Sequence, residues 1–122
     1  MLSINNLDIN SPQLDRVFDA LASPKRRGIF DTLSRGPATV TQLATEHNLS
    51  LPAIHRHIRT LEEAGLIQRK KVGRTNYVAI KRTAMRATQA WLRQYRTDWG
   101  TDEETLENYI NEAHLSQEGP TS

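Results

Sequence analysis

The sequence contains no cysteine among its 122 residues. This absence excludes disulfides, thiolate metal sites and a cysteine nucleophile within the chain. No apolar run approaches the roughly 18 residues that a membrane-spanning helix requires. The first six residues also lack the basic-then-apolar order of a secretory signal. We therefore expect a cytoplasmic protein that does not enter a membrane.

Motifs of catalysis are missing as well. The sequence has no G-x-S-x-G, no P-loop and no G-x-G-x-x-G pattern. The acidic run at residues 102–104 has a simpler explanation, because carboxylates stabilise the first turn of a helix. The chain is long enough for one domain with a real core, but not for two catalytic domains. We expect neither an enzyme nor a cofactor.

Charge is distributed unevenly, although the net charge is only +2. Residues 24–82 hold twelve Lys and Arg against four Asp and Glu, whereas residues 83–122 hold three against seven. The first 23 residues are acidic too, with one Arg against three Asp. A basic middle between acidic ends favours a central segment that faces a polyanion. A solvated charged surface would have the same composition.

Two helices are predicted before residue 36. Ser11-Pro12 and Ser23-Pro24 each supply an N-cap followed by a proline that suits the first turn. The first start signal precedes an apolar stripe at helical spacing, made of Leu14, Val17, Phe18 and Leu21. Gly36-Pro37 ends the second helix.

A short helix, a tight turn and a longer helix are predicted over about residues 40–64. Thr39 and Gln42 fit a capping box at the start of the short helix. Ser50 can cap the longer helix, and Gly65 can end it. The face of the longer helix that points to the core carries Ile54, Ile58 and Leu61. This is the order of a helix-turn-helix, whose second helix can enter a DNA major groove.

The periodicity then changes to that of strands. Residues 66–72 and 75–80 are β-rich and flank Gly73-Arg74, a pair that suits a type II′ turn or a slightly longer loop. A helix-turn-helix followed by a basic hairpin is the winged arrangement.

Two further helices are predicted, over residues 83–99 and from Thr101 to residue 113. The first of them carries a seam at spacings of three and four, made of Met85, Thr88, Leu92, Tyr95 and Trp99. We therefore expect a mainly α-helical fold with a small β-hairpin wing. It should form a single DNA-binding and dimerisation domain over residues 1–115, followed by a polar tail at 116–122.

Several segments match one protein family in the correct order. They are residues 21–27, residues 36–44, residues 49–67, and the wing residues Gly73, Arg74 and Tyr77. Through them the sequence resembles the ArsR-type winged helix-turn-helix repressors of bacteria over about residues 13–113. It is most similar to the branch that lacks metal ligands and carries a W-L-x-x-Y-x-x-x-W run, here residues 91–99.

The resemblance implies a homodimeric repressor that binds a double-stranded DNA operator. It also implies that the first helix and the last two helices build the dimer interface. The interface residues expected on the stripes of these helices are Leu14, Val17, Phe18, Leu92, Tyr95, Trp99, Leu106, Tyr109 and Ile110. The effector stays open between a small molecule, another protein and none.

The longer helix of the helix-turn-helix and the wing carry the predicted DNA contacts. Arg56 can bind guanine with two hydrogen bonds, and the surface of Pro52 or Ala53 can contact a thymine methyl group. His57 is expected to be a structural or phosphate-binding residue. The full predicted set is Ser50, Pro52, Ala53, His55, Arg56, His57, Arg59, Lys70, Lys71 and Arg74. Solvated residues on a helix face and on an edge strand are the alternative explanation.

Three more cations, Lys25, Arg26 and Arg27, open the second helix, where they oppose the helix dipole. Either a phosphate contact or an intramolecular pair with an acidic helix would compensate, and we expect such a pair for Arg26 and Arg27. Arg69 precedes Lys70 and Lys71 and gives the wing a further positive charge.

A metal sensor, common among relatives, is not expected. Residues 83–99 contain no His, and His55 and His57 are two residues apart, so they do not share a helix face. A second class of function stays open. The aromatic helix with Trp91, Tyr95 and Trp99 could dock a protein or a ligand, with only non-specific DNA binding.

Overall fold

The computed structural model describes residues 8–95 and 101–117. Its elements follow in the order α1 (Pro12–Leu21), α2 (Pro24–Ser34), β1 (Ala38–Thr39), α3 (Val40–Glu46), α4 (Leu51–Glu63), β2 (Ile67–Val72), β3 (Thr75–Ile80), α5 (Arg82–Arg93) and α6 (Asp102–Gln117). Within these residues, none of the helices combines the length and apolar composition that crossing a membrane requires.

The predicted N-caps are confirmed. The Oγ of Ser11 accepts a hydrogen bond from the backbone N of Leu14, and the Oγ of Ser23 accepts one from the backbone N of Arg26. Each helix then begins with a proline, whose missing N–H costs nothing at that position. These starts fix the short connection between α1 and α2.

The sheet is antiparallel, with strand order β1-β3-β2. The predicted hairpin is present, and Val72 pairs with Thr75 across a two-residue loop. Gly73 has a φ of +62°, whereas Arg74 has no positive φ, which is the pattern of a type II′ turn. The short strand β1 was not expected from the sequence; in it Ala38 pairs with Val78 and Thr39 with Tyr77.

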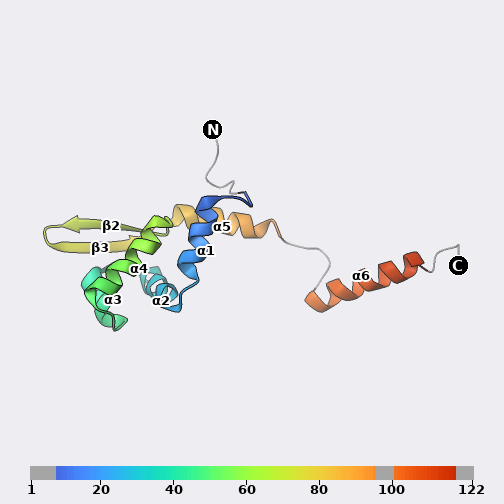
Figure 1. Ribbon diagram of the computed structural model, residues 1–122, viewed down its shortest axis with the longest axis horizontal. Helices are drawn as coiled ribbons and strands as arrows, with labels where there is room; N and C mark the ends of the chain where they lie inside the picture. Colours follow the sequence, from blue (N-terminus) through green and yellow to red (C-terminus); the bar gives the residue numbers. More distant parts are fainter. Residues whose placement is uncertain (1–7, 96–100, 118–122) are drawn as a thin grey trace.

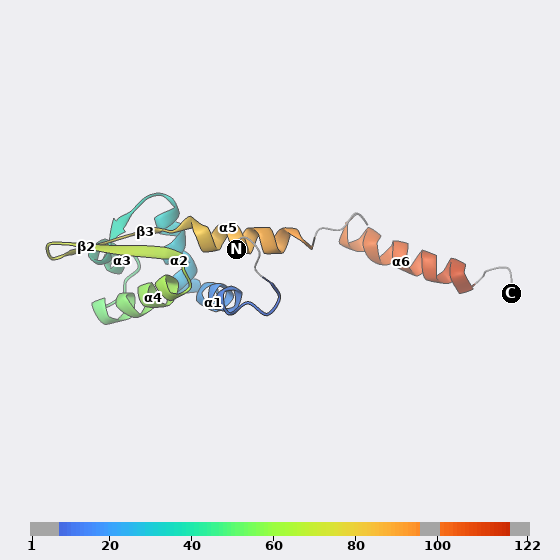
Figure 2. The same cartoon turned by 90° about the horizontal axis from the view of Figure 1, so that it is seen from above.

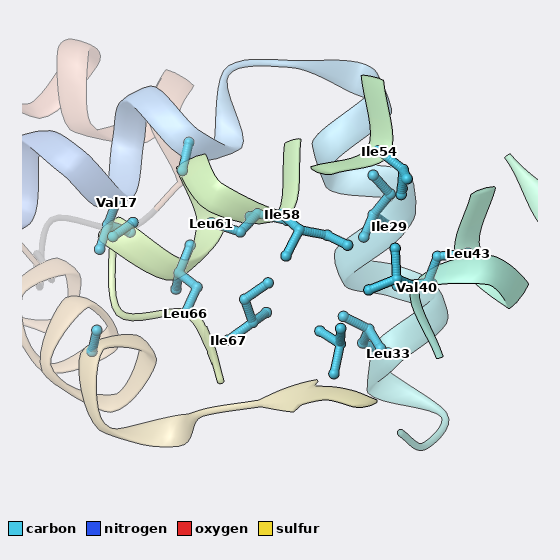
Figure 3. Packing of buried hydrophobic residues seen from close by; sticks show 14 of the residues in the cluster. Val17, Ile29, Leu33, Val40, Leu43, Ile54, Ile58, Leu61, Leu66 and Ile67 are labelled. Carbon is cyan, nitrogen blue, oxygen red and sulfur yellow. The ribbon is translucent and has the colours of Figure 1, made fainter. Parts of the chain in front are cut away.

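One hydrophobic core joins the helices α1 to α5 to the sheet (Figure 3). Ile54, Ile58 and Leu61 of α4 are completely buried, as the predicted stripe requires. Ile29 from α2 and Leu43 from α3 are equally inaccessible and meet this stripe. This packing fixes the buried face of α4 against the core and leaves the opposite face of the helix exposed to solvent.

The overall shape is elongated. The hairpin of β2 and β3 projects beyond α3 and α4 at one end, and α5 extends away from it past α1 (Figure 1). In both views α6 lies apart from the other elements (Figure 2). The α5 helix ends at Arg93, earlier than the predicted limit of residue 99. Trp99 lies outside the described residues.

The last helix begins as predicted at Thr101. Its backbone N donates to Oε2 of Glu104 at 3.0 Å, and the backbone N of Glu104 donates to Oγ1 of Thr101 at 3.2 Å. This reciprocal pair is a capping box. The helix continues to Gln117, two residues beyond the expected domain limit at 115.

Candidate nucleic-acid interface

The turn between α3 and α4 sets the angle of the helix-turn-helix. Asn48 has a φ of +52°, and its backbone N donates to the O of Thr45. The backbone N of Leu49 donates to the O of Ala44 at 2.9 Å. These two bonds form a Schellman motif, in which Asn tolerates the left-handed position better than most residues. The α3 helix therefore ends sharply, and only four residues separate it from α4.

Both helices of the motif begin as predicted. The Oγ1 of Thr39 accepts from the backbone N of Gln42, and the side chain of Gln42 accepts from the backbone N of Thr39. Ser50 caps α4 by accepting from the backbone N of Ala53 at 3.3 Å. The α4 helix thus presents its N-terminal turn at a defined place on the surface.

The predicted DNA contacts on α4 form an accessible face opposite the buried stripe. Ser50, Pro52, Arg56 and Arg59 are exposed. Ala53, His55 and His57 are half-buried at the edges of this face. No hydrogen bond or ion pair holds the guanidinium of Arg56 or of Arg59 within the described part of the chain. Both cations are available to a phosphate or a base edge.

The wing carries three predicted cations that are also exposed: Lys70, Lys71 and Arg74. Arg69 differs from them, because its Nη2 donates to Oε1 of Glu62 at 3.0 Å and its Nη1 lies 3.4 Å from Nδ1 of His55. Its side chain is only 26% exposed. We conclude that Arg69 joins the wing to α4 and is not one of the free cations of the wing.

A polar cavity of about 460 Å³ separates α4 from the tip of the wing. It brings His55 and Arg74 together, although they are distant in the sequence. Its other lining residues are Thr39, Val40, Thr41, Leu51, Thr75 and Asn76. Residues of the helix-turn-helix and of the wing therefore line one shared cavity.

Arg26 and Arg27 form the intramolecular contacts that were expected, but with backbone carbonyls. Nε of Arg26 donates to the O of Ala20 at 2.7 Å, and Nη1 of Arg27 donates to the O of Leu21 at 2.9 Å. Positive charge is favourable beside the C-terminal carbonyls of a helix, here α1. Both contacts are to the C-terminal end of α1, a helix that carries Asp15 and Asp19. Within the described part of the chain, neither Arg26 nor Arg27 forms an ion pair with a carboxylate.

His57 lies near this cationic group. Burial lowers the pKa of His57 below its ordinary value, and the charges of Arg26, Arg56 and Lys25 lower it further. Both effects favour the neutral form of the His57 ring. A neutral imidazole still has one N–H donor, so the structural and the phosphate-binding roles expected for His57 both stay predictions.

Of the residues expected at the dimer interface, those that the structure describes are either buried within their own chain or exposed on its surface. Leu14 and Val17 are 3% and 1% exposed, so they are buried by their own chain and are not accessible to a partner. The expectation placed both residues at the interface, and their burial argues against that. Phe18 on α1, Leu92 on α5 and Tyr95, two residues after the end of α5, are exposed. Trp91 joins them through edge-on ring contacts, at 5.9 Å to Phe18 and 4.9 Å to Tyr95 between centroids.

The third part of the expected interface lies on α6. Leu106, Tyr109 and Ile110 are exposed by 61%, 63% and 53%. In the described part of the chain, no group of three or more His, Asp or Glu side chains is arranged to hold a metal ion.

Comparisons with known proteins agree with this arrangement. A family model for a helix-turn-helix domain matches residues 21–69. The transcriptional repressor SdpR of Bacillus subtilis is 30% identical over 79 residues, which are 65% of this chain and 88% of the repressor.

Similarity to solved structures covers a larger part of the chain than the helix-turn-helix match. The crystal structure of an ArsR family transcriptional regulator is 42% identical, with a TM-score of 0.63 over 70% of this chain and 94% of its own. A homodimeric winged helix-turn-helix DNA-binding domain from Mycobacterium bovis is 30% identical, with a TM-score of 0.56. That match covers 67% of this chain and 75% of the other. The fold, the exposed cations and these relatives lead to one conclusion: the chain belongs to the ArsR family of winged helix-turn-helix, DNA-binding transcriptional regulators.

Proposed function

We propose that this chain is a homodimeric, cytoplasmic repressor that binds an inverted-repeat operator. The observation that carries the proposal is the accessible cationic face of α4, continuous with the cations of the wing. Arg56 and Arg59 are exposed opposite a completely buried stripe, and Lys70, Lys71 and Arg74 are exposed beside them. An exposed helix with cations at its N-terminal half has the geometry that a major groove accepts.

Each residue of this surface has a proposed role. Arg56 contacts a guanine, since its guanidinium is unpaired and lies in the first half of α4. Ala53 and Pro52 contact a thymine methyl group, and Ser50 binds a phosphate while it caps the helix. The remaining contacts are to phosphates, from Arg59, His57, Lys70 and Lys71, and to the minor groove, from Arg74.

The second half of the proposal concerns the dimer. Large apolar side chains are exposed on α1 and near the end of α5, and their exposure to water is unfavourable. They are Phe18, Leu92 and Tyr95. The exposed side chains of α6 have the same character. A two-fold axis through this surface would place two α4 helices in successive major grooves, about 34–36 Å apart. Occupation of such a site blocks polymerase, which is how repression would arise.

The first experiment is selection of bound duplexes from a random DNA pool. The proposal predicts enrichment of an inverted repeat whose half-sites are separated by about one helical turn. Retention of DNA without any enriched motif would contradict it. That outcome would instead favour a protein-interaction module that binds DNA only non-specifically.

The dimer is tested by light scattering during size exclusion. The wild-type chain should elute as a dimer, and Leu92→Glu should shift it to monomer because a carboxylate would be buried at the interface. Val72→Glu is the matched control, since Val72 is similarly exposed, by 56%, but lies on the wing. A monomeric wild-type chain, or a dimer that Leu92→Glu leaves intact, would refute this interface.

A further inference from the structure

His55 occupies an unusual place on α4. Its ring is half-buried and lines the cavity that separates α4 from the wing. Nδ1 of this ring lies 3.4 Å from Nη1 of Arg69, which belongs to β2. Nη2 of the same guanidinium donates to Oε1 of Glu62, two helical turns after His55 on α4. One guanidinium therefore contacts both side chains at once.

The chemistry of arginine fixes the direction of the contact with His55. A guanidinium has only donors and stays protonated at any ordinary pH. Nδ1 of His55 must then accept the hydrogen bond, so it cannot carry a proton. In the neutral ring the proton is on Nε2. Glu62 holds the guanidinium in place, because it binds the other arm of the same planar group.

We propose that Arg69 and Glu62 fix His55 as a hydrogen-bond donor, with Nε2–H available to a ligand in the cavity between α4 and the wing. The ligand is a hydrogen-bond acceptor of duplex DNA, either a base-edge atom such as purine N7 or a phosphate oxygen. A cytosine amino group is excluded, because it is itself a donor. This inference rests on the proposed DNA-binding function. In it Arg69 is a positioning residue, in contrast to the exposed Lys70 next to it.

The fixed ring can be tested without DNA. Long-range ¹H–¹⁵N spectra of the ¹⁵N-labelled full chain, recorded at about pH 8, report which imidazole nitrogen carries the proton. His55→Gln assigns the signals. We expect an unprotonated Nδ1 and a protonated Nε2 in the wild type. A proton on Nδ1, or equal amounts of the two tautomers, overturns the proposal.

The part played by Arg69 needs a matched pair of variants. Arg69→Met should give a mixture of tautomers at His55, whereas Lys70→Met removes the same charge from the same strand and should leave the ring unchanged. A fixed ring in Arg69→Met overturns the positioning role. The wild-type spectrum decides the state of the ring even if Arg69→Met does not fold.

The ligand is tested on the duplex selected from the random pool. Replacing a contacted purine by its 7-deaza analogue removes a base acceptor, and a methylphosphonate removes a charged phosphate oxygen. One of the two should weaken binding by about threefold to tenfold in the wild type, the effect of one hydrogen bond, and should have no effect in His55→Ala. If neither substitution distinguishes wild type from variant, His55 is not a donor to DNA. Failure to select any duplex would refute the proposed function instead, and the NMR result would stand independently.

Discussion

Replacement of Arg56 by alanine is the most selective test of the proposed DNA-contacting face of α4. The side chain is exposed and no intramolecular partner holds its guanidinium in the described part of the chain. The backbone O of Arg56 accepts from Oγ1 of Thr60, and this bond survives the substitution. Alanine is also the best helix former. The free energy of unfolding should therefore change by less than about 0.5 kcal/mol.

The affinity for operator DNA should change much more than the free energy of unfolding. Loss of a bidentate contact to guanine costs about 1–3 kcal/mol, which corresponds to roughly a fivefold to 150-fold weaker affinity for the selected operator. Discrimination at one base pair should be lost at the same time. Affinity for an unrelated duplex should fall much less, because a single phosphate contact contributes little there.

The assay is fluorescence anisotropy with the operator, with single-base variants of it and with a scrambled duplex, combined with urea unfolding. Arg86→Ala is the control, since Arg86 is exposed on α5 and lies outside the proposed DNA surface. Unchanged affinity and preference in Arg56→Ala would refute the assignment. An equal loss on every duplex would make Arg56 a phosphate contact, which also contradicts the prediction.

Three further predictions concern the wing, the core and pH. Arg74→Ala should weaken binding and reduce the slope of log K against log salt by about 1, whereas an unchanged slope would place the wing tip away from DNA. Ile58→Ala should lower the free energy of unfolding by about 2–5 kcal/mol in a urea titration, because Ile58 is completely buried; a loss below 1 kcal/mol would contradict the core. Because the pKa of His57 is lowered in the folded state, the unfolded state takes up a proton first as the pH falls through about 6.5. The folded state should therefore lose stability in this range, and His57→Gln should reduce that loss; equal pH profiles of unfolding for the two proteins would contradict the lowered pKa.

Local signals in the sequence were enough to predict most of the DNA-binding half. Ser50 and the Thr39–Gln42 pair were recognised as caps because their bonds reach only three residues along the chain. The Gly73-Arg74 turn was recognised for a similar reason, since a two-residue hairpin needs particular backbone angles. The buried stripe of α4 followed from helical periodicity alone.

Non-local contacts were the ones that the sequence did not reveal. The strand β1 has two residues and exists only through its pairing with β3, about forty positions later. The ion pair of Arg69 with Glu62 joins β2 to α4, and nothing in the run of wing cations separated Arg69 from Lys70. Both features depend on how the hairpin folds back on the helices.

The stripe of α1 shows another limit of periodicity. Leu14, Val17 and Phe18 share one apolar face, yet the first two are buried within the chain and the third is exposed. Helical spacing tells which residues need an apolar partner, but not whether that partner is the same chain or a second copy. The structure divides this stripe between core and surface.

The central claim is that α4 and the wing together read a DNA sequence. The most direct measurement is the ratio of the affinities for the selected operator and for a scrambled duplex of equal length, at physiological salt. The account predicts a ratio of at least about 10³, the lower end for specific DNA-binding proteins. A ratio close to one would contradict it, because the exposed cations would then bind DNA only as a polyanion.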